Sequence, residues 1–173
     1  MLLIRAIVAF LALPTMVAGV VPALLVHGSP VVPRMAAAGA VVMSPGIAFL
    51  LWCVRDFFAS GRGTLAPWDP PKHLVTVGLY RFVRNPMYAA ILLIVGGWGL
   101  LFLSKPLAIY LTALALLFHI RVRLFEEPWL RRHFGREWEV YSRVTGRWVP
   151  RWNRRGKHGR QANPNGWVTR PDK

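Results

Sequence analysis

The sequence contains a single cysteine, Cys53, and few acidic residues: seven Asp and Glu stand against 22 Lys and Arg. One cysteine excludes a disulfide within the chain and a metal site built from cysteines. Cys53 falls in an apolar run, which is typical of a small buried side chain. Outside the apolar runs there is no alternation of strand and helix patterns long enough for a soluble α/β domain. We therefore predict neither a metal site nor such a domain.

Charge and apolar residues are strongly segregated along the 173 residues. The chain is 54% apolar, yet its formal net charge is +15. Most basic residues follow Ile120, and five more lie between Arg55 and Arg84, while the apolar residues form runs that are almost free of charge. This pattern indicates a membrane protein with basic loops. Nucleic-acid binding explains the same charge less well, so we expect no nucleic-acid partner.

Four apolar runs predict membrane helices, at residues 2–26, 35–58, 88–103 and 107–120. A span needs about 20 apolar residues. The first two runs reach this length, and the last two do so only if polar residues at their ends continue the helices. The short polar connection at residues 104–106 predicts an antiparallel hairpin. The expected fold is an all-α, polytopic membrane helical bundle with about four transmembrane helices.

The distribution of Lys and Arg predicts the orientation of this bundle. Basic residues lie between the second and third runs and after the fourth, while the opposite side has only Arg34 and Lys105. Cytoplasmic loops carry the excess of positive charge. The first run is longer than the apolar core of a typical signal peptide, so we expect it to be kept in the protein as a membrane helix. We thus predict an integral, multi-pass membrane protein whose N-terminus, central loop and C-terminus are cytoplasmic and can share one site.

The domain organisation follows from the same composition. We expect one membrane domain over residues 1–152, with two N-terminal spans in 1–58 and the candidate site in 59–152. Residues 153–173 are rich in Arg, Gly, Asn and Pro and predict a basic, mostly disordered tail. Its charge suits anionic headgroups, although a solvated tail without a specific partner is the simpler alternative. Gly96, Gly97 and Gly99 predict close helix packing inside the third run.

The most polar segment, residues 78–88, stands directly before the third apolar run. Polar groups at the mouth of a membrane helix are costly, and function is the usual reason for keeping them. Asn85 suits a helix N-cap and Pro86 suits a first turn. That helix start would present free N–H groups, which suit a carboxylate. Simple capping, and an interfacial aromatic belt formed by Tyr80 and Tyr88, are the alternatives.

Two further polar clusters lie on the same predicted side. Residues 61–64 (Gly-Arg-Gly-Thr) allow close approach of backbone to a ligand, or form a simple exit turn. The other cluster continues the fourth run. At helical spacing Arg123 faces Glu126 and Glu127, and the paired carboxylates could hold an ammonium group or form an ion-paired helix end. Pro128 predicts a bend near Glu126, followed by a short amphipathic surface helix over residues 133–141.

Together these motifs resemble the integral membrane methyltransferases related to isoprenylcysteine carboxyl methyltransferase and phosphatidylethanolamine N-methyltransferase. The resemblance covers roughly half the chain, residues 61–150. It rests on the ordered recurrence of several short motifs, at residues 61–64, 73–76, 84–88, 126–130 and 134–135. It implies a methyltransferase that uses S-adenosyl-L-methionine, held by the C-terminal half of the helical bundle, and a lipophilic or lipid substrate among the membrane lipids.

The resemblance also implies roles for individual residues. Arg84, Arg123 and Glu127 are the expected catalytic residues, and an amine acceptor would need a base such as Glu127 or His119. No metal ligand is implied. The expected cofactor-binding residues are Gly61, Gly63, Lys72, His73, Leu74, Val75, Tyr80, Asn85, Pro86, Met87, Tyr88 and Glu126, the last of which should bind the cofactor's amino group.

The branch of the family, and so the acceptor, is less clear from the sequence. The isoprenylcysteine branch usually has His where this chain has Asn85, while the phospholipid branch can carry Asn and also the Glu-Glu-Pro run of residues 126–128. The density of arginines favours an anionic acceptor or an anionic headgroup, and arginines that only mark the cytoplasmic interface are an equally good alternative. The main interpretation is therefore isoprenylcysteine-type methyl transfer to a lipid or prenyl-type acceptor at the cytoplasmic face. Phospholipid amine N-methylation, an NADPH-dependent membrane reductase and a non-catalytic membrane protein are the alternatives, and O- and N-methylation are not distinguished.

Overall fold

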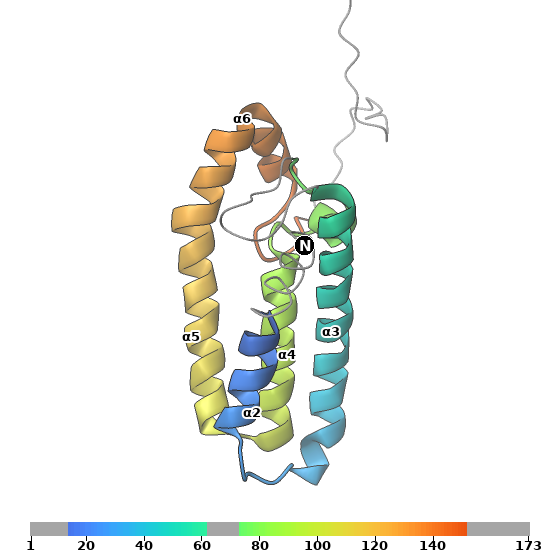
Figure 1. Ribbon diagram of the computed structural model, residues 1–173, viewed down its shortest axis with the longest axis vertical. Coiled ribbons are helices and arrows are strands. Elements are labelled where there is room, and N and C mark those ends of the chain that lie inside the picture. Colours follow the sequence, from blue (N-terminus) through green and yellow to red (C-terminus); the bar gives the residue numbers. More distant parts are fainter. Residues whose placement is uncertain (1–13, 62–72, 152–173) are drawn as a thin grey trace, which may run out of the picture.

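The computed structural model describes residues 14–61 and 73–151, and of residues 57–61 only the backbone. The regular secondary structure in these ranges consists of helices (Figure 1). The only strand-like feature there is an isolated bridge between Val83 and Gly146. The predicted tail, residues 153–173, lies outside the described residues. The elements are η1 (Met16–Val20), α2 (Val21–Leu25), α3 (Pro33–Gly61), η2 (Gly78–Arg81), α4 (Pro86–Phe102), α5 (Lys105–Arg121), η3 (Val122–Glu126) and α6 (Glu127–Val144).

Two helical stretches of the described chain are long and apolar enough to cross a membrane. They are Pro33–Asp56 of α3 and Lys105–Val144, in which α5, η3 and α6 follow one another directly along the chain. Met16–Leu25 and Pro86–Phe102 are apolar but shorter. The four predicted runs therefore all contain helix, while the number of membrane crossings stays a prediction. Residues 2–13 of the first run lie outside the described residues.

Helices α3 and α4 pack most extensively, and glycines let their backbones approach closely. A Cβ atom added to Gly39 would lie 2.9 Å from the carbonyl oxygen of Gly97, and one added to Gly97 would lie 2.9 Å from that of Gly39. The predicted close packing is thus confirmed at Gly97. It is wrong for its neighbours, because a Cβ at Gly96 would make an ordinary 3.9 Å contact and one at Gly99 would meet nothing within 4 Å.

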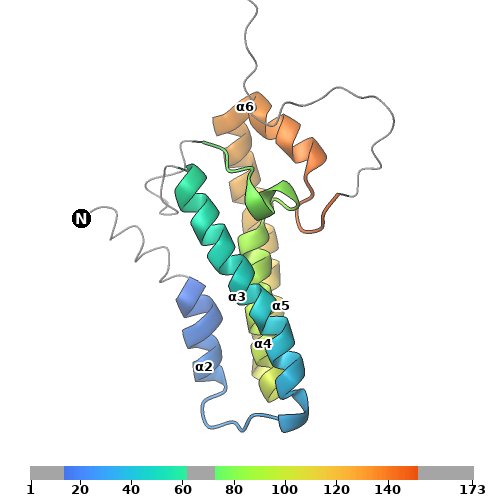
Figure 2. The ribbon, with the colours of Figure 1, turned by 90° about the vertical axis from the view of Figure 1, so that its right-hand side faces the viewer.

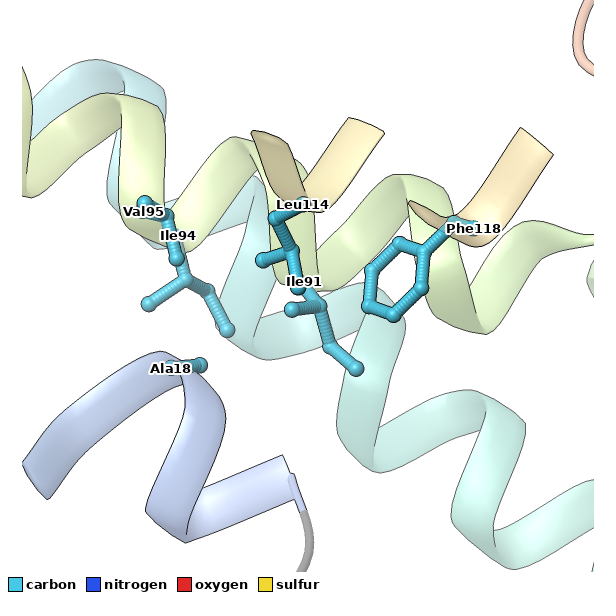
Figure 3. Packing of buried hydrophobic residues seen from close by; sticks show 6 residues of the cluster. All are labelled: Ala18, Ile91, Ile94, Val95, Leu114 and Phe118. Carbon is cyan, nitrogen blue, oxygen red and sulfur yellow. The ribbon is translucent and has the colours of Figure 1, made fainter. Parts of the chain in front are cut away.

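The predicted hairpin between the third and fourth runs is confirmed. Helix α4 ends where Leu103 adopts a left-handed conformation with a φ of 43°, and α5 begins two residues later. The Ser104 side chain accepts a hydrogen bond from the Leu107 backbone N–H at 3.5 Å, which caps α5. Figure 3 shows the apolar core between η1, α4 and α5, formed by Ala18, Ile91, Ile94, Val95, Leu114 and Phe118.

The predicted bend near Glu126 is wrong in place and form. The chain remains helical there, and the π-helical turn η3 separates α5 from α6. A wider turn disrupts the ordinary hydrogen-bond ladder, so Pro128, which lies in the first turn of α6, is accommodated without a break. The sharp change of direction comes at Gly135, with φ 48° and ψ −118°. Figure 2 shows α6 turning away from the line of α5.

The polar segments meet at one end of the bundle. Figure 1 shows the end of α3, the start of α4 and the junction of α5 with α6 together at the top, while the α2–α3 and α4–α5 connections lie at the bottom. The prediction that the centre of the chain and its C-terminal segment share one end is therefore confirmed. The part of α6 after Gly135 turns Trp138 and Tyr141 inward, and its position on a membrane surface remains a prediction.

Candidate functional site

The Glu126 carboxylate lies against the first turn of α4. The Tyr88 hydroxyl donates a hydrogen bond to Glu126 Oε1, and Arg121 Nε donates to the same oxygen at 2.8 Å. The Tyr88 ring packs on Phe118 of α5, with 4.3 Å between the ring centroids, which fixes the direction of the hydroxyl. Two residues far apart in the sequence are thereby brought together, and one carboxylate oxygen of Glu126 remains without a hydrogen bond from the described residues.

The π-helical turn explains the arginine that pairs with Glu126. In an α-helix, residues three and four apart share a face, whereas a π-helical turn brings residues five apart together. Arg121 and Glu126 are five apart and form the ion pair. The predicted pairing of Arg123 with Glu126 and Glu127 is therefore wrong. Arg123 is exposed and pairs with no acidic side chain in the described part of the chain.

Glu127 is held between two arginines from distant segments. Arg84 Nη1 lies 3.0 Å from Glu127 Oε1, while Arg147 donates through Nε at 2.7 Å and Nη2 at 2.6 Å to the two carboxylate oxygens. The side chains of Arg84, Glu127 and Arg147 are 10%, 16% and 30% exposed, so the triad is largely removed from water. Such bidentate, charge-assisted pairs are geometrically specific, which makes Glu127 a clamp between the start of α4 and the segment after α6.

Two opposing effects act on these arginines. Burial lowers the pKa of Arg84, and the charge of Glu127 opposes that shift. The hydrogen bonds from Arg147 to Glu127 raise the pKa of Arg147. The Arg84 guanidinium also lies over the Trp138 ring, 5.5 Å from its centroid, so the ring compensates part of the lost hydration.

Backbone contacts join the same two segments. The Arg84 N–H donates to the Gly146 carbonyl at 2.8 Å, and the Tyr141 hydroxyl donates to the Tyr80 carbonyl at 2.7 Å. Helix α4 begins at Pro86, as predicted, and Asn85 occupies the N-cap position. Its side chain makes no capping hydrogen bond, however, and instead donates from Nδ2 to the Arg147 carbonyl at 3.2 Å. The first N–H groups of α4 therefore have no side-chain cap from Asn85.

The other predicted site residues are placed less centrally. Val75 is buried, Leu74 is half-buried and His73 is exposed, all three in the stretch leading to η2. Gly61 is the last residue of α3. Gly63 and Lys72 lie outside the described residues. His119 lies two residues before Arg121 in α5, and its Nδ1 accepts a hydrogen bond from Trp148 Nε1 at 3.2 Å.

Three residues that the structure places at this end of the bundle were not among the predicted site residues. Arg147 follows α6 in a stretch without a recognised motif, and only the need of Glu127 for a cationic partner could have indicated it. Gly146 permits the close contact after α6, because a Cβ there would lie 1.8 Å from the Val149 carbonyl oxygen. Asp56 is buried near the end of α3. Its place in an apolar run was the signal available in the sequence.

Comparison with known proteins shows to which family the chain belongs. Residues 35–137 match the phospholipid methyltransferase family. A phosphatidylethanolamine N-methyltransferase from Phaeosphaeria nodorum is 33% identical over 97 residues, which cover 54% of this chain but only 9% of that protein. No solved structure matches the chain. Because the family match covers more than half of the residues, the chain belongs to the phospholipid methyltransferase family, a family of membrane methyltransferases.

Proposed function

We propose that this methyltransferase transfers the methyl group of S-adenosyl-L-methionine to the amine of a phospholipid headgroup. The family match and the fungal relative favour this alternative over the isoprenylcysteine-type reaction that was the main interpretation of the sequence. The observation that carries the proposal is the position of Glu126, whose carboxylate lies beside the first turn of α4. The acceptor would be a membrane lipid, reached at the cytoplasmic end of a multi-pass bundle.

The residues around Glu126 fit the amino-acid end of the cofactor. That end carries an ammonium and a carboxylate on one carbon atom, so it needs an anion and a set of N–H donors close together. Glu126 supplies the anion, and the first turn of α4 supplies N–H groups that Asn85 does not cap. Tyr88 connects the two, because it belongs to that turn and donates to Glu126. When bound, the cofactor supplies a methyl group already activated by a positively charged sulfur.

The remaining predicted cofactor residues extend this site along the chain. We propose that Tyr80 and residues 85–88 line the cofactor. Of the stretch before η2, we propose that Leu74 and Val75 contribute, while Gly63 and Lys72, outside the described residues, stay predicted cofactor-binding residues. Aromatic rings such as Tyr80 and Tyr88 suit the positively charged sulfur or the adenine. The protein's contribution would be alignment of donor and acceptor and exclusion of water.

The predicted catalytic residues take different roles in this proposal. Both oxygens of Glu127 already accept hydrogen bonds from arginines, so a proton arriving there would have to compete with those N–H donors. We therefore propose that Arg84 and Glu127 chiefly position the start of α4. Arg123 is exposed near the polar end of the bundle and suits the phosphate of a lipid headgroup. We propose that none of these three residues removes the proton from the acceptor.

The experiment measures the affinity for S-adenosylhomocysteine by calorimetry in detergent. A charge-assisted hydrogen bond contributes about 1.5–3 kcal/mol, so Glu126→Gln should weaken binding by roughly 10–100-fold. Glu139→Gln is the matched control, since Glu139 is exposed and forms only a long 3.5 Å pair with Arg131. Unchanged affinity in Glu126→Gln would refute the assignment. A thermal-shift comparison of S-adenosyl-L-methionine with NADPH separates the methyltransferase from a reductase.

A further inference from the structure

Asp56 is a buried carboxylate to which the proposed function assigns no role. It lies one turn before the end of α3, is 9% exposed, and its Oδ2 atom has no hydrogen-bond partner among the described residues. No basic side chain of residues 14–56 or 73–151 forms an ion pair with it. Removing an ionised group from water without a partner is costly, and ionisable groups kept at membrane helices usually serve function.

The carboxylate reaches into the turn that leads to the site. Gly78 opens η2 with a φ of 57°, and a Cβ atom on it would lie 1.7 Å from Asp56 Oδ2. The same Cβ would lie 3.1 Å from Trp52 Nε1. Gly78 therefore serves two purposes, since it permits the left-handed conformation and leaves the space that the Asp56 carboxylate occupies.

Among the described residues, the groups identified around Asp56 come from two elements, and none of these groups is positively charged. Trp52 and Cys53 belong to α3, and Tyr80 belongs to η2. Burial raises the pKa of Tyr80, and Cys53, Tyr88 and Asp56 act in the same direction. Tyr80 follows Gly78 in η2, the element whose first residue the Asp56 carboxylate contacts. Asp56 thus contacts the start of η2, and Glu126 contacts the first turn of α4, the helix that follows η2 along the chain.

We propose that Asp56 binds the ammonium group of the lipid acceptor and takes up the proton that this group must lose. The inference rests on the proposed function and names the residue that recognises the acceptor. It divides the work between two acidic residues, Glu126 for the amino-acid end of the cofactor and Asp56 for the acceptor. A primary ammonium supplies the positive charge and the N–H donors that the buried carboxylate lacks.

The proton and electron balance of this step is simple. One N–H bond of the acceptor ammonium breaks, its proton bonds to Asp56 Oδ2, and the electron pair stays on nitrogen. That pair forms the new N–C bond to the methyl group as the C–S bond breaks, and the sulfur keeps the electrons of that bond as a neutral thioether. The product is a methylated ammonium, and Asp56 returns its proton to water before the next cycle.

The test uses Asp56→Asn in the full chain, with Glu139→Gln as the matched control. We expect methylation of phosphatidylethanolamine to fall by about 10²–10⁴-fold near neutral pH, the usual contribution of a general base. S-adenosylhomocysteine affinity should stay within about twofold of the wild type. The loss should shrink towards about pH 10, where an alkylammonium begins to lose its proton without help. The melting temperature should not fall, since the substitution removes an unpaired buried charge.

Gly78→Ala provides a second variant, with Gly99→Ala as its control because nothing lies within 4 Å of the Gly99 position. It should lower methylation by displacing the carboxylate, again without weakening S-adenosylhomocysteine binding. The inference is overturned if Asp56→Asn weakens that binding as Glu126→Gln does, or if it lowers the melting temperature and reduces activity equally at every pH. A wild-type protein that methylates no amine would refute the proposed function itself, whereas equal activities of wild type and Asp56→Asn would refute the role of Asp56 alone.

Discussion

The clamp around Glu127 gives a stability prediction that can be worked from the structure. Glu127→Gln would leave Arg84 and Arg147 without their shared counter-charge, at side-chain exposures of 10% and 30%. Breaking a fully buried pair costs about 3–5 kcal/mol, and an exposed pair contributes about 0–1 kcal/mol. The triad lies between these limits but nearer the buried one, so we expect a loss of about 2–3 kcal/mol. For a chain of this size that corresponds to a melting temperature lower by about 4–12 °C.

The assay is thermal unfolding in detergent, with Glu139→Gln as the control. Glu139 and Arg131 are 46% and 71% exposed and 3.5 Å apart, so the control should change stability by less than about 0.5 kcal/mol. Arg147→Gln should cost less than Glu127→Gln, because Glu127 would keep its pair with Arg84. If Glu127→Gln and Glu139→Gln lower the melting temperature equally, the clamp does not hold the start of α4 to the segment after α6.

Two further predictions concern single contacts. Tyr88→Phe removes one donor but leaves Glu126 its other hydrogen bond, so S-adenosylhomocysteine affinity should fall about 5–10-fold by calorimetry, less than for Glu126→Gln; a loss as large as that of Glu126→Gln would contradict this. Gly97→Val should destabilise the protein by about 1–3 kcal/mol in thermal unfolding, because its Cβ would lie 2.9 Å from a carbonyl oxygen of α3, and Gly99→Val should cost clearly less.

The helices were predictable because apolar runs identify them directly. Runs 35–58, 88–103 and 107–120 correspond to α3, α4 and α5, and Pro86 marks the start of α4 as its fixed φ requires. The bend near Glu126 was wrong because the expectation treated Pro128 as an interruption. A π-helical turn can instead absorb a proline that follows it, and periodicity in the sequence does not reveal such a turn.

The site was only partly predictable for a related reason. The importance of Tyr88 and Glu126 followed from the resemblance, and the structure places them in contact. The predicted partner of Glu126 was wrong, because the π-helical turn brings Arg121, and not Arg123, next to Glu126. Arg147 reaches Glu127 through a return of the chain after α6, a tertiary contact that no local pattern encodes.

The proposed phospholipid N-methylation is tested most directly by measuring methyl transfer itself. The purified protein is reconstituted in vesicles of phosphatidylethanolamine with labelled S-adenosyl-L-methionine, and the label is followed into the lipid headgroup by mass spectrometry. A farnesylcysteine analogue in parallel vesicles serves as the competing acceptor. We expect label on the headgroup nitrogen in the wild type, a strong reduction in Glu126→Gln, and little label on the analogue. Label on the carboxyl group of the analogue and none on the phospholipid would contradict the proposed phospholipid N-methylation.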